Sequence, residues 1–204
     1  MTALFLLRHG LTYANKLNLL QGTLENSKTF LTPQSKVEIT QLQKLLSRYR
    51  IDLVYTSPLN RAFDTTEIIC DNRAPFTIDQ RLRELSYGKW NGKSWSYLID
   101  NYCNYVNLKT QEVSSSSMSI SQGESFEQGQ QRIKSFVNEI SFRFPNNRVL
   151  LVTHGWIIKN FIAIYWNDNC KAAQFNPRNL SLTKFLIDRK QNNFKLVFYD
   201  RLFL

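Results

Sequence analysis

Residues 4–10 read LFLLRHG, an apolar run that ends in arginine, histidine and glycine. A short apolar run of this kind is typical of a buried β-strand. The polar residues would then lie just beyond the carboxyl end of the strand, which is where open α/β sheets bind their ligands. The chain has two histidines, and the second repeats the arrangement, because residues 149–155 read VLLVTHG. The two stretches therefore predict two His-Gly pairs at one edge of a parallel sheet.

Between and after these stretches, apolar runs alternate with segments that carry helix signals. Thr32 followed by Pro33, and Thr56-Ser57 followed by Pro58, combine a capping residue with a proline suited to the first helical turn. Ser125 opens a capping box. The expected strands are residues 4–7, 51–55, 76–78, 149–153, 180–187 and 194–199, and the expected helices are residues 33–49, 58–70, 94–106, 125–140 and a helix that starts just after Gly155.

This alternation of strands and helices predicts an α/β fold, with three α/β/α layers around a mostly parallel central sheet of about six strands. The short link at residues 190–193 predicts a hairpin, so that one late strand runs antiparallel. With 204 residues, the chain has the length of one domain. We expect residues 1–204 to form it, with a lid-like insertion at about residues 94–124. The serine-rich part of that insertion, residues 109–123, is consistent with a mobile lid and with a flexible surface loop.

The composition is that of a globular protein, with 43% hydrophobic and 21% charged residues. The N-terminal apolar run stops at Arg8, which makes it too short for a signal-peptide core or a membrane span. The three cysteines lie far apart and lack the C-x-x-C spacing of metal and redox sites. We therefore expect a cytoplasmic protein with reduced thiols and no membrane partner.

The formal net charge is +10, and three explanations are open. The charge is consistent with a solvated basic surface, with an anionic small substrate and with nucleic acid. The lysines and arginines are scattered, and no nucleic-acid-binding module is recognisable. The charge therefore favours a basic surface first, an anionic substrate next and nucleic acid last.

Polar residues follow four of the expected strands. His9 follows the first strand, Arg61 the second, Glu84 the third and His154 the fourth. Right-handed crossovers bring the carboxyl ends of parallel strands to one edge of the sheet. Together with Arg8, these residues predict a crevice that holds two arginines, two imidazoles and one carboxylate.

This set of side chains suits a phosphoryl group. Arginine offers a planar fork to phosphate oxygens, and the helix after Gly155 adds amide donors and a partial positive charge. A neutral histidine can act as a nucleophile, and a carboxylic acid can protonate the leaving group. No cluster of aspartates or cysteines accompanies the histidines, so we expect no metal and no cofactor. Glu84 is the expected acid, although Glu67, Glu124 and Glu127 are also available.

Six blocks of sequence, in order along nearly the whole chain, carry a family resemblance. They are RHGLT at residues 8–12 with Asn15 and Gln21-Gly22 after it, TSPLNRA at 56–62 with Thr65 beyond, LRE at 82–84, GKWNG at 88–92, GES at 123–125 and HG at 154–155. In these blocks the chain resembles the histidine phosphatase superfamily, the phosphoglycerate mutase-like proteins. The resemblance implies a phosphoglycerate mutase-like fold.

The resemblance also implies a role for each matching residue. His9 would attack phosphorus and become a phosphohistidine. Glu84 would protonate the departing oxygen and then deprotonate the water that cleaves the phosphoenzyme. The phosphoryl oxygens would be held by Arg8, Arg61 and His154. Further hydrogen bonds and the pocket wall would come from Asn15, Gln21, Gly22, Ser57 and Gly155.

The blocks around Glu84 and at residues 88–92 resemble the phosphatase branch of the family more than the mutase branch. Leu11 also stands where mutases usually have an acid or an amide. We therefore expect a metal-independent phosphomonoester phosphatase that acts on a small phosphorylated metabolite. A phosphoglycerate mutase is the first alternative, and a non-catalytic protein that binds nucleotides or nucleic acid in the basic pocket is the second. The sequence leaves the physiological substrate and the oligomeric state open.

Overall fold

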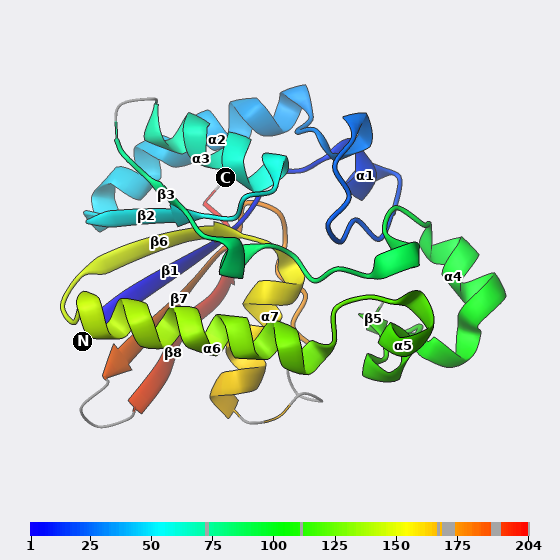
Figure 1. Ribbon diagram of the computed structural model, residues 1–204. Coiled ribbons are helices and arrows are strands. Elements are labelled where there is room, and N and C mark those ends of the chain that lie inside the picture. Colours follow the sequence, from blue (N-terminus) through cyan, green and yellow to red (C-terminus); the bar gives the residue numbers. More distant parts are fainter. Residues whose placement is uncertain (72–73, 111, 167, 169–173, 189–192, 204) are drawn as a thin grey trace.

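The computed structural model (Figure 1) describes residues 1–71, 74–110, 112–166, 168, 174–188 and 193–203. Its centre is a six-stranded sheet in the order β3-β2-β6-β1-β7-β8. These strands are β1 Thr2–Arg8, β2 Leu53–Thr56, β3 Thr77–Ile78, β6 Arg148–Thr153, β7 Leu182–Asp188 and β8 Asn193–Arg201. Strands β1, β2, β3 and β6 are parallel, whereas β7 is antiparallel to both of its neighbours. The expected fold class is confirmed, although most of the expected hairpin turn, residues 190–192, lies outside the described residues.

Helices cover both faces of the sheet. They are α2 Pro33–Leu46, α3 Asn60–Cys70, α6 Phe126–Arg143 and α7 Gly155–Trp166. Successive side chains of a strand point to opposite faces, so the apolar run in β1 supplies both cores. Phe5 and Leu7 pack in the core that includes α2 and α3, and Leu4 and Leu6 pack in the core that includes α6 and α7. Figure 1 shows α2 and α3 above the sheet and α6 and α7 below it.

The remaining elements gather beyond the carboxyl ends of the parallel strands, at the right of Figure 1. They are α1 Tyr13–Lys16, α4 Trp95–Tyr102, β4 Val106–Asn107, β5 Glu112–Val113 and α5 Met118–Ser121. Strands β4 and β5 form a separate two-stranded antiparallel sheet. Short 3-10 turns lie at Ser27–Thr29, Ser47–Tyr49, Gln80–Leu82, Gly88–Trp90, Cys103–Tyr105 and Ser115–Ser117.

The serine-rich stretch is more regular than a flexible surface loop. It contains β5, a 3-10 turn and α5. The Ser117 hydroxyl donates to the carbonyl of Ser114 at 2.7 Å, and Met118 is buried in the core. The loop interpretation of residues 109–123 is therefore wrong over much of their length, because serine hydroxyls stabilise turns and helix starts as well as loops. A lid-like action of residues 94–124 stays a prediction.

Two of the expected helix starts have the expected caps. The Thr32 side chain accepts a hydrogen bond from the amide of Ser35, with Pro33 at the first helical position. Ser125 and Gln128 form the reciprocal capping box that opens α6. These starts follow from local chemistry, which satisfies backbone amides that lack a partner within the helix.

The third expected start is wrong by two residues. Helix α3 begins at Asn60, and its N-cap residue, Leu59, has no capping side chain. The Ser57 hydroxyl accepts from the amide of Leu59 at 3.2 Å, so it stabilises a turn before the helix. Arg61 still lies in the first helical turn, as expected.

Other sequence expectations concern the cysteines and the membrane. Cys70 and Cys103 are free thiols, the first buried and the second exposed, whereas Cys170 lies outside the described residues. None of the helices in the described part of the chain combines the length and the apolarity needed to cross a membrane.

Candidate active site

A cavity of about 320 Å³ lies at the carboxyl ends of the parallel strands. Segments that are far apart in the sequence contribute its walls. Eight residues expected from the sequence line it: Arg8, His9, Asn15, Gln21, Gly22, Arg61, Glu84 and Gly155. Ser57 and His154 are fully buried and are not part of the lining. The crossovers of the sheet thus bring most of the predicted residues to one place.

His9 is held as a neutral imidazole with a defined tautomer. Its Nδ1 lies 2.8 Å from the carbonyl oxygen of Gly10, and Arg61 Nε donates to its Nε2 at 3.3 Å. A carbonyl oxygen can only accept a hydrogen bond, so the proton lies on Nδ1 and the lone pair on Nε2. The side chain is 2% exposed. Burial, followed by the charges of Arg61 and Arg8, holds the pKa of His9 well below its ordinary value.

His154 lies beside His9, with ring centroids 5.1 Å apart. Its Nε2 is 2.7 Å from the Ser57 hydroxyl, which already accepts from the Leu59 amide. Nε2 is the acceptor that the structure offers to the Ser57 O–H among the described residues, so the hydroxyl donates to Nε2 and the proton of His154 lies on Nδ1. That Nδ1 is buried and has no hydrogen-bond partner among the described residues. Burial first, and then Arg61 and His9, hold the pKa of His154 well below its ordinary value.

Ser57 therefore does not line the cavity, although the sequence predicted it in the pocket wall. Instead of forming the wall, its hydroxyl orients the imidazole of His154. The sequence places both residues after strands β2 and β6, but only the pairing of those strands brings the two side chains into contact.

The two arginines present buried positive charge to the cavity. Arg61 is 1% exposed and donates through Nη2 to the carbonyl of Gly22 at 2.7 Å. Burial lowers the pKa of Arg61 to about 10, so its guanidinium is still charged at neutral pH. Arg8 donates through Nη1 to the carbonyl of Pro177 at 2.6 Å, and its buried Nε has no partner among the described residues.

Gly22 is needed where it is because of its backbone conformation. Its φ is +50°, in the left-handed region that favours glycine. A Cβ atom at this position would overlap the Asn91 side chain. This turn points the carbonyl of Gly22 at Arg61 and so fixes the guanidinium in the cavity.

Glu84 is the acid that lines the cavity among the four that the sequence offered. Its Oε1 accepts from the amide of Leu85 at 3.1 Å, and its Oε2 accepts from the amide of Trp156 at 3.4 Å, at the start of α7. Burial raises the pKa of Glu84, against the opposing charge of Arg61. Glu124 instead pairs with Arg132 at 2.8 Å, and neither it nor Glu67 nor Glu127 lines the cavity.

Several residues of the site were not predicted from the sequence. Asn179 donates through Nδ2 to the carbonyl oxygens of His9 and Gly10, at 2.9 and 3.3 Å, and no local pattern marks it. Lys159, Glu112 and Tyr87 also line the cavity. Lys159 could have been found, since it interrupts the apolar stretch GWIIKNFIAIYW of residues 155–166, and a lysine in a buried helix needs a partner.

Among the residues that the structure describes, the charged lining consists of three cations, Arg8, Arg61 and Lys159, and two carboxylates, Glu84 and Glu112. Within the described ranges, no group of three or more histidine, cysteine, aspartate or glutamate side chains is placed to hold a metal ion. The positive charge that a phosphoryl group needs is therefore available from arginine. A neutral imidazole and a carboxyl group with a raised pKa complete a set suited to nucleophilic and acid-base chemistry.

Comparisons with known proteins place the chain in one protein family. The model of the family described as Histidine phosphatase superfamily (branch 1) matches residues 4–200. Phosphoserine phosphatase 1 of Hydrogenobacter thermophilus is 26% identical over 194 residues, which cover 94% of this chain and 90% of that protein. Adenosylcobalamin/alpha-ribazole phosphatase of Escherichia coli is 28% identical over 165 residues, which cover 78% of this chain and 77% of that protein. The solved structure of Bacillus stearothermophilus YhfR superimposes with a TM-score of 0.81 at 25% identity, covering 99% of this chain and 98% of that one.

Proposed function

The chain belongs to the histidine phosphatase superfamily, branch 1, and is a phosphatase; we propose that it hydrolyses phosphomonoesters of small metabolites through a phosphohistidine at His9, without a metal. The observation that supports this most strongly is the contact between His9 Nε2 and Arg61 Nε at 3.3 Å. It combines an unprotonated nitrogen with a buried guanidinium on the wall of one cavity. Attack on phosphorus needs both a lone pair and positive charge around the phosphoryl oxygens.

In the first step, His9 Nε2 forms a bond to phosphorus while the ester P–O bond breaks. The Nδ1 proton, donated to the carbonyl of Gly10, keeps the ring in the tautomer whose Nε2 is unprotonated, and the hydrogen bond from Arg61 to Nε2 gives way as the bond to phosphorus forms. The departing alkoxide takes its proton from Glu84. The raised pKa of the Glu84 carboxyl favours the protonated form that this step requires.

In the second step, the Glu84 carboxylate accepts a proton from water. The water oxygen bonds to phosphorus, the N–P bond breaks, and the electron pair returns to His9 Nε2. Inorganic phosphate leaves, and Glu84 is protonated again for the next cycle. One carboxyl group thus serves as acid and then as base.

The phosphoryl oxygens are held by donors that lack other partners. Arg8 Nε, on the cavity wall, and His154 Nδ1, in the ring packed behind the wall against that of His9, are buried atoms without a hydrogen-bond partner in the described part of the chain. Leaving such groups unpaired is costly, which favours a site that receives an oxygen atom at each. Arg61 and the amides at the start of α7 contribute further donors and positive charge. The side chains of Asn15 and Gln21 and the backbone of Gly22 complete the wall.

The test is the fate of the phosphoryl group. Purified protein is incubated with 3-phosphoglycerate and with p-nitrophenyl phosphate, and inorganic phosphate, 2-phosphoglycerate and acid-labile phosphoprotein are measured with and without EDTA. We expect phosphate from both esters, a phosphoprotein intermediate and no effect of EDTA. The formation of 2-phosphoglycerate without phosphate release would instead identify a mutase. Salt-dependent binding of duplex DNA without phosphate release from either ester would identify a non-catalytic binder.

We also propose that residues 1–204 form a single domain, that the protein is cytoplasmic, and that it has no nucleic-acid partner.

A further inference from the structure

A second charged pair lines the active-site cavity, and the proposed phosphoryl transfer does not use it. Lys159 Nζ donates to Glu112 Oε1 at 2.6 Å. The Lys159 side chain is 9% exposed and that of Glu112 is 23% exposed. Both residues line the same cavity as His9 and Glu84. The pair therefore lies where the part of the substrate beyond its phosphoryl group must lie.

The position of Lys159 follows from the helix that carries it. Lys159 is four residues after Gly155 in α7, so both lie on one face of the helix, separated by about 6 Å along its axis. The start of α7 faces the phosphoryl end of the cavity through Gly155. Lys159 is thus one helical turn further from the reaction centre. This separation suits the two ends of a small substrate.

Glu112 comes from the other side of the cavity, on β5. Tyr87, Glu84 and Glu112 line the same cavity, and in addition to burial the carboxylates of Glu84 and Glu112 raise the pKa of the Tyr87 hydroxyl. The Lys159–Glu112 pair therefore shares this cavity with the catalytic acid, although the whole of α4 and β4 lies between Glu84 and Glu112 in the sequence.

A contribution to stability alone is a weak explanation for this pair. Removing two charges from water costs free energy that their attraction barely recovers, and apolar residues in the same place are often as stable or more so. The neighbouring residues of α7 show that apolar side chains fit well here, since Ile157, Ile158 and Phe161 are buried. Lys159 has three N–H donors, and the bond to Glu112 takes one of them. The pair therefore retains capacity to bind charged groups of a ligand.

The balance of charge in the cavity indicates which groups those are. The dianionic phosphoryl group of a substrate is matched by Arg8 and Arg61. Glu84 is protonated when it acts as the acid, and Lys159 and Glu112 neutralise each other. A head group with a net charge would leave one member of the pair without a counter-charge in a poorly hydrated site, which is unfavourable. A head group with one positive and one negative charge would give each member of the pair a second partner of opposite charge, so that four charges of alternating sign lie together.

We propose that Lys159 binds the carboxylate and Glu112 binds the ammonium group of a phosphorylated α-amino acid, so that this pair selects the substrate. The proposal rests on the phosphatase function proposed above. A cavity of about 320 Å³ is at the lower end of the range for small-molecule sites, and it accommodates a substrate of this size.

The test compares four phosphomonoesters that differ in the head group. O-phosphoserine carries both charged groups, 3-phosphoglycerate has a hydroxyl in place of the ammonium, phosphoethanolamine lacks the carboxylate, and glycerol 3-phosphate lacks both. For each ester, kcat/KM is divided by the value for p-nitrophenyl phosphate. We expect the ratio for O-phosphoserine to exceed the other three by at least about tenfold, since each charged hydrogen bond lost costs about that factor or more.

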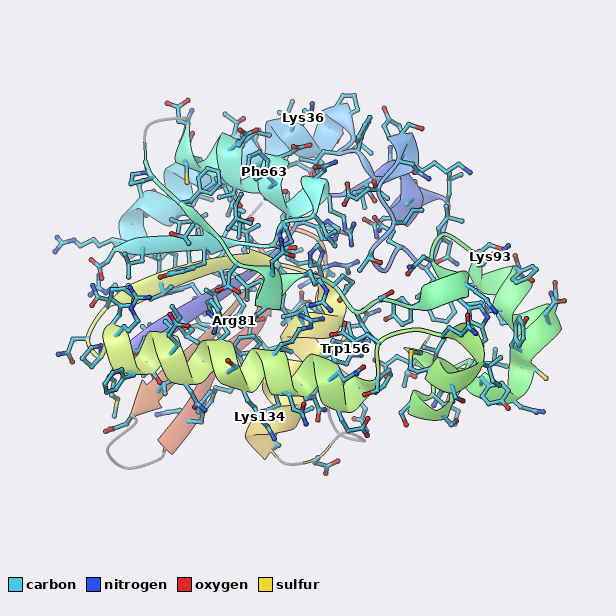
Figure 2. All side chains as sticks on the ribbon, viewed as in Figure 1. Lys36, Phe63, Arg81, Lys93, Lys134 and Trp156 are labelled. Atoms are coloured by element: carbon cyan, nitrogen blue, oxygen red, sulfur yellow. The ribbon has the colours of Figure 1, made fainter. Side chains whose placement is uncertain are left out.

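Two variants test which residue binds the carboxylate and which binds the ammonium group. Lys159→Met is expected to remove the preference for O-phosphoserine over phosphoethanolamine, by about 10- to 100-fold, because the carboxylate loses its partner. Glu112→Gln is expected to remove the preference for O-phosphoserine over 3-phosphoglycerate by a similar factor. Lys134→Met is the matched control. Lys134 is exposed on α6 and does not line the cavity, whereas Trp156 of α7 does; Figure 2 labels both residues. This variant is therefore expected to leave every ratio unchanged.

The outcomes separate this proposal from the phosphatase function. If the wild-type protein hydrolyses p-nitrophenyl phosphate but prefers 3-phosphoglycerate or glycerol 3-phosphate, the proposed head group is wrong and the phosphatase function stands. If none of the four phosphomonoesters nor p-nitrophenyl phosphate is hydrolysed, the proposed phosphatase function itself is wrong. If Lys159→Met and Glu112→Gln lower all ratios equally, the pair has only a structural role. Should either variant unfold, the double variant Lys159→Gln with Glu112→Gln keeps a neutral hydrogen-bonded pair, and its loss of the O-phosphoserine preference decides the question.

Discussion

The two ends of the active-site cavity are built in different ways. At the phosphoryl end, the side chains follow β1, β2 and β6, and backbone atoms hold them in place. His9 is fixed by the carbonyl of Gly10, Arg61 by that of Gly22, and Arg8 by that of Pro177. At the other end, Glu112 stands on a two-residue strand and reaches Lys159 through a single ion pair.

This difference indicates that one end of the cavity carries out the phosphoryl transfer and that the other end selects the substrate. Groups aimed at a transition state are effective only when they are held in place before the reaction, which the sheet and its backbone carbonyls provide. Groups that choose a head group can stand on a peripheral element, because changing them alters the substrate and not the reaction. Variants at the phosphoryl end should therefore affect all esters, and variants at the other end should change the ratio between esters.

The largest effect is expected from His9→Ala. Without the nucleophile, kcat should fall by at least about 10⁴-fold for every phosphomonoester, and no acid-labile phosphoprotein should form. The measurement is phosphate release together with acid-labile phosphate on the protein. A residual activity that depends strongly on the head group would contradict the separation of the two ends.

The next effect is expected from Glu84→Gln. An alkyl phosphate should be hydrolysed about 10²- to 10⁴-fold more slowly, the usual contribution of a general acid or base. p-Nitrophenyl phosphate should lose less, because its leaving group needs little protonation. Single-turnover rates of enzyme phosphorylation with both esters measure this difference, and equal losses would rule out Glu84 as the acid.

A smaller effect is expected from Arg61→Lys. The guanidinium of Arg61 binds the Gly22 carbonyl while its Nε lies beside His9, and the single ammonium of lysine cannot serve both positions. We expect kcat to fall by about 10²- to 10³-fold for all esters alike. Arg143→Lys, at a residue that is 57% exposed, is the control and should keep full activity. A selective loss for one ester would place Arg61 in substrate choice.

The smallest effect concerns stability and pH. Both histidines of the chain are buried with lowered pKa values. As the pH falls below about 6.5, the unfolded chain binds a proton at each imidazole and the folded protein does not, so the free energy of unfolding decreases. Each histidine contributes a slope of up to about 1.4 kcal/mol per pH unit.

Urea unfolding of the wild type and of His154→Gln between pH 7 and pH 5.5 measures this slope. The variant should show a slope that is smaller by up to about 1.4 kcal/mol per pH unit. The raised pKa of Glu84 acts in the opposite direction at lower pH, but it is common to both proteins. Identical slopes would mean that His154 binds a proton in the folded state as readily as in the unfolded chain. The phosphoryl end of the cavity would then exclude water less than the burial of His154 indicates.

The sequence by itself determined the parts of this protein that depend on local chemistry. The apolar runs at residues 4–7 and 149–153 predicted the central strands, because alternate residues of a buried strand face two cores. Capping residues at Thr32 and Ser125 fixed two helix starts, since they satisfy amides within three residues of themselves. The order of strands and helices then placed His9, Arg61 and Glu84 at one edge.

Only the tertiary structure decided which side chains meet. The contact of His9 with Arg61, the contact of Ser57 with His154 and the choice of Glu84 over Glu124 depend on contacts between residues far apart in the chain. Lys159 and Glu112 are separated by 47 residues, and no local pattern relates them. A capping box or a periodic pattern of apolar residues involves residues only a few positions apart. The environment that shifts a pKa or pairs a buried charge forms only when distant elements pack together.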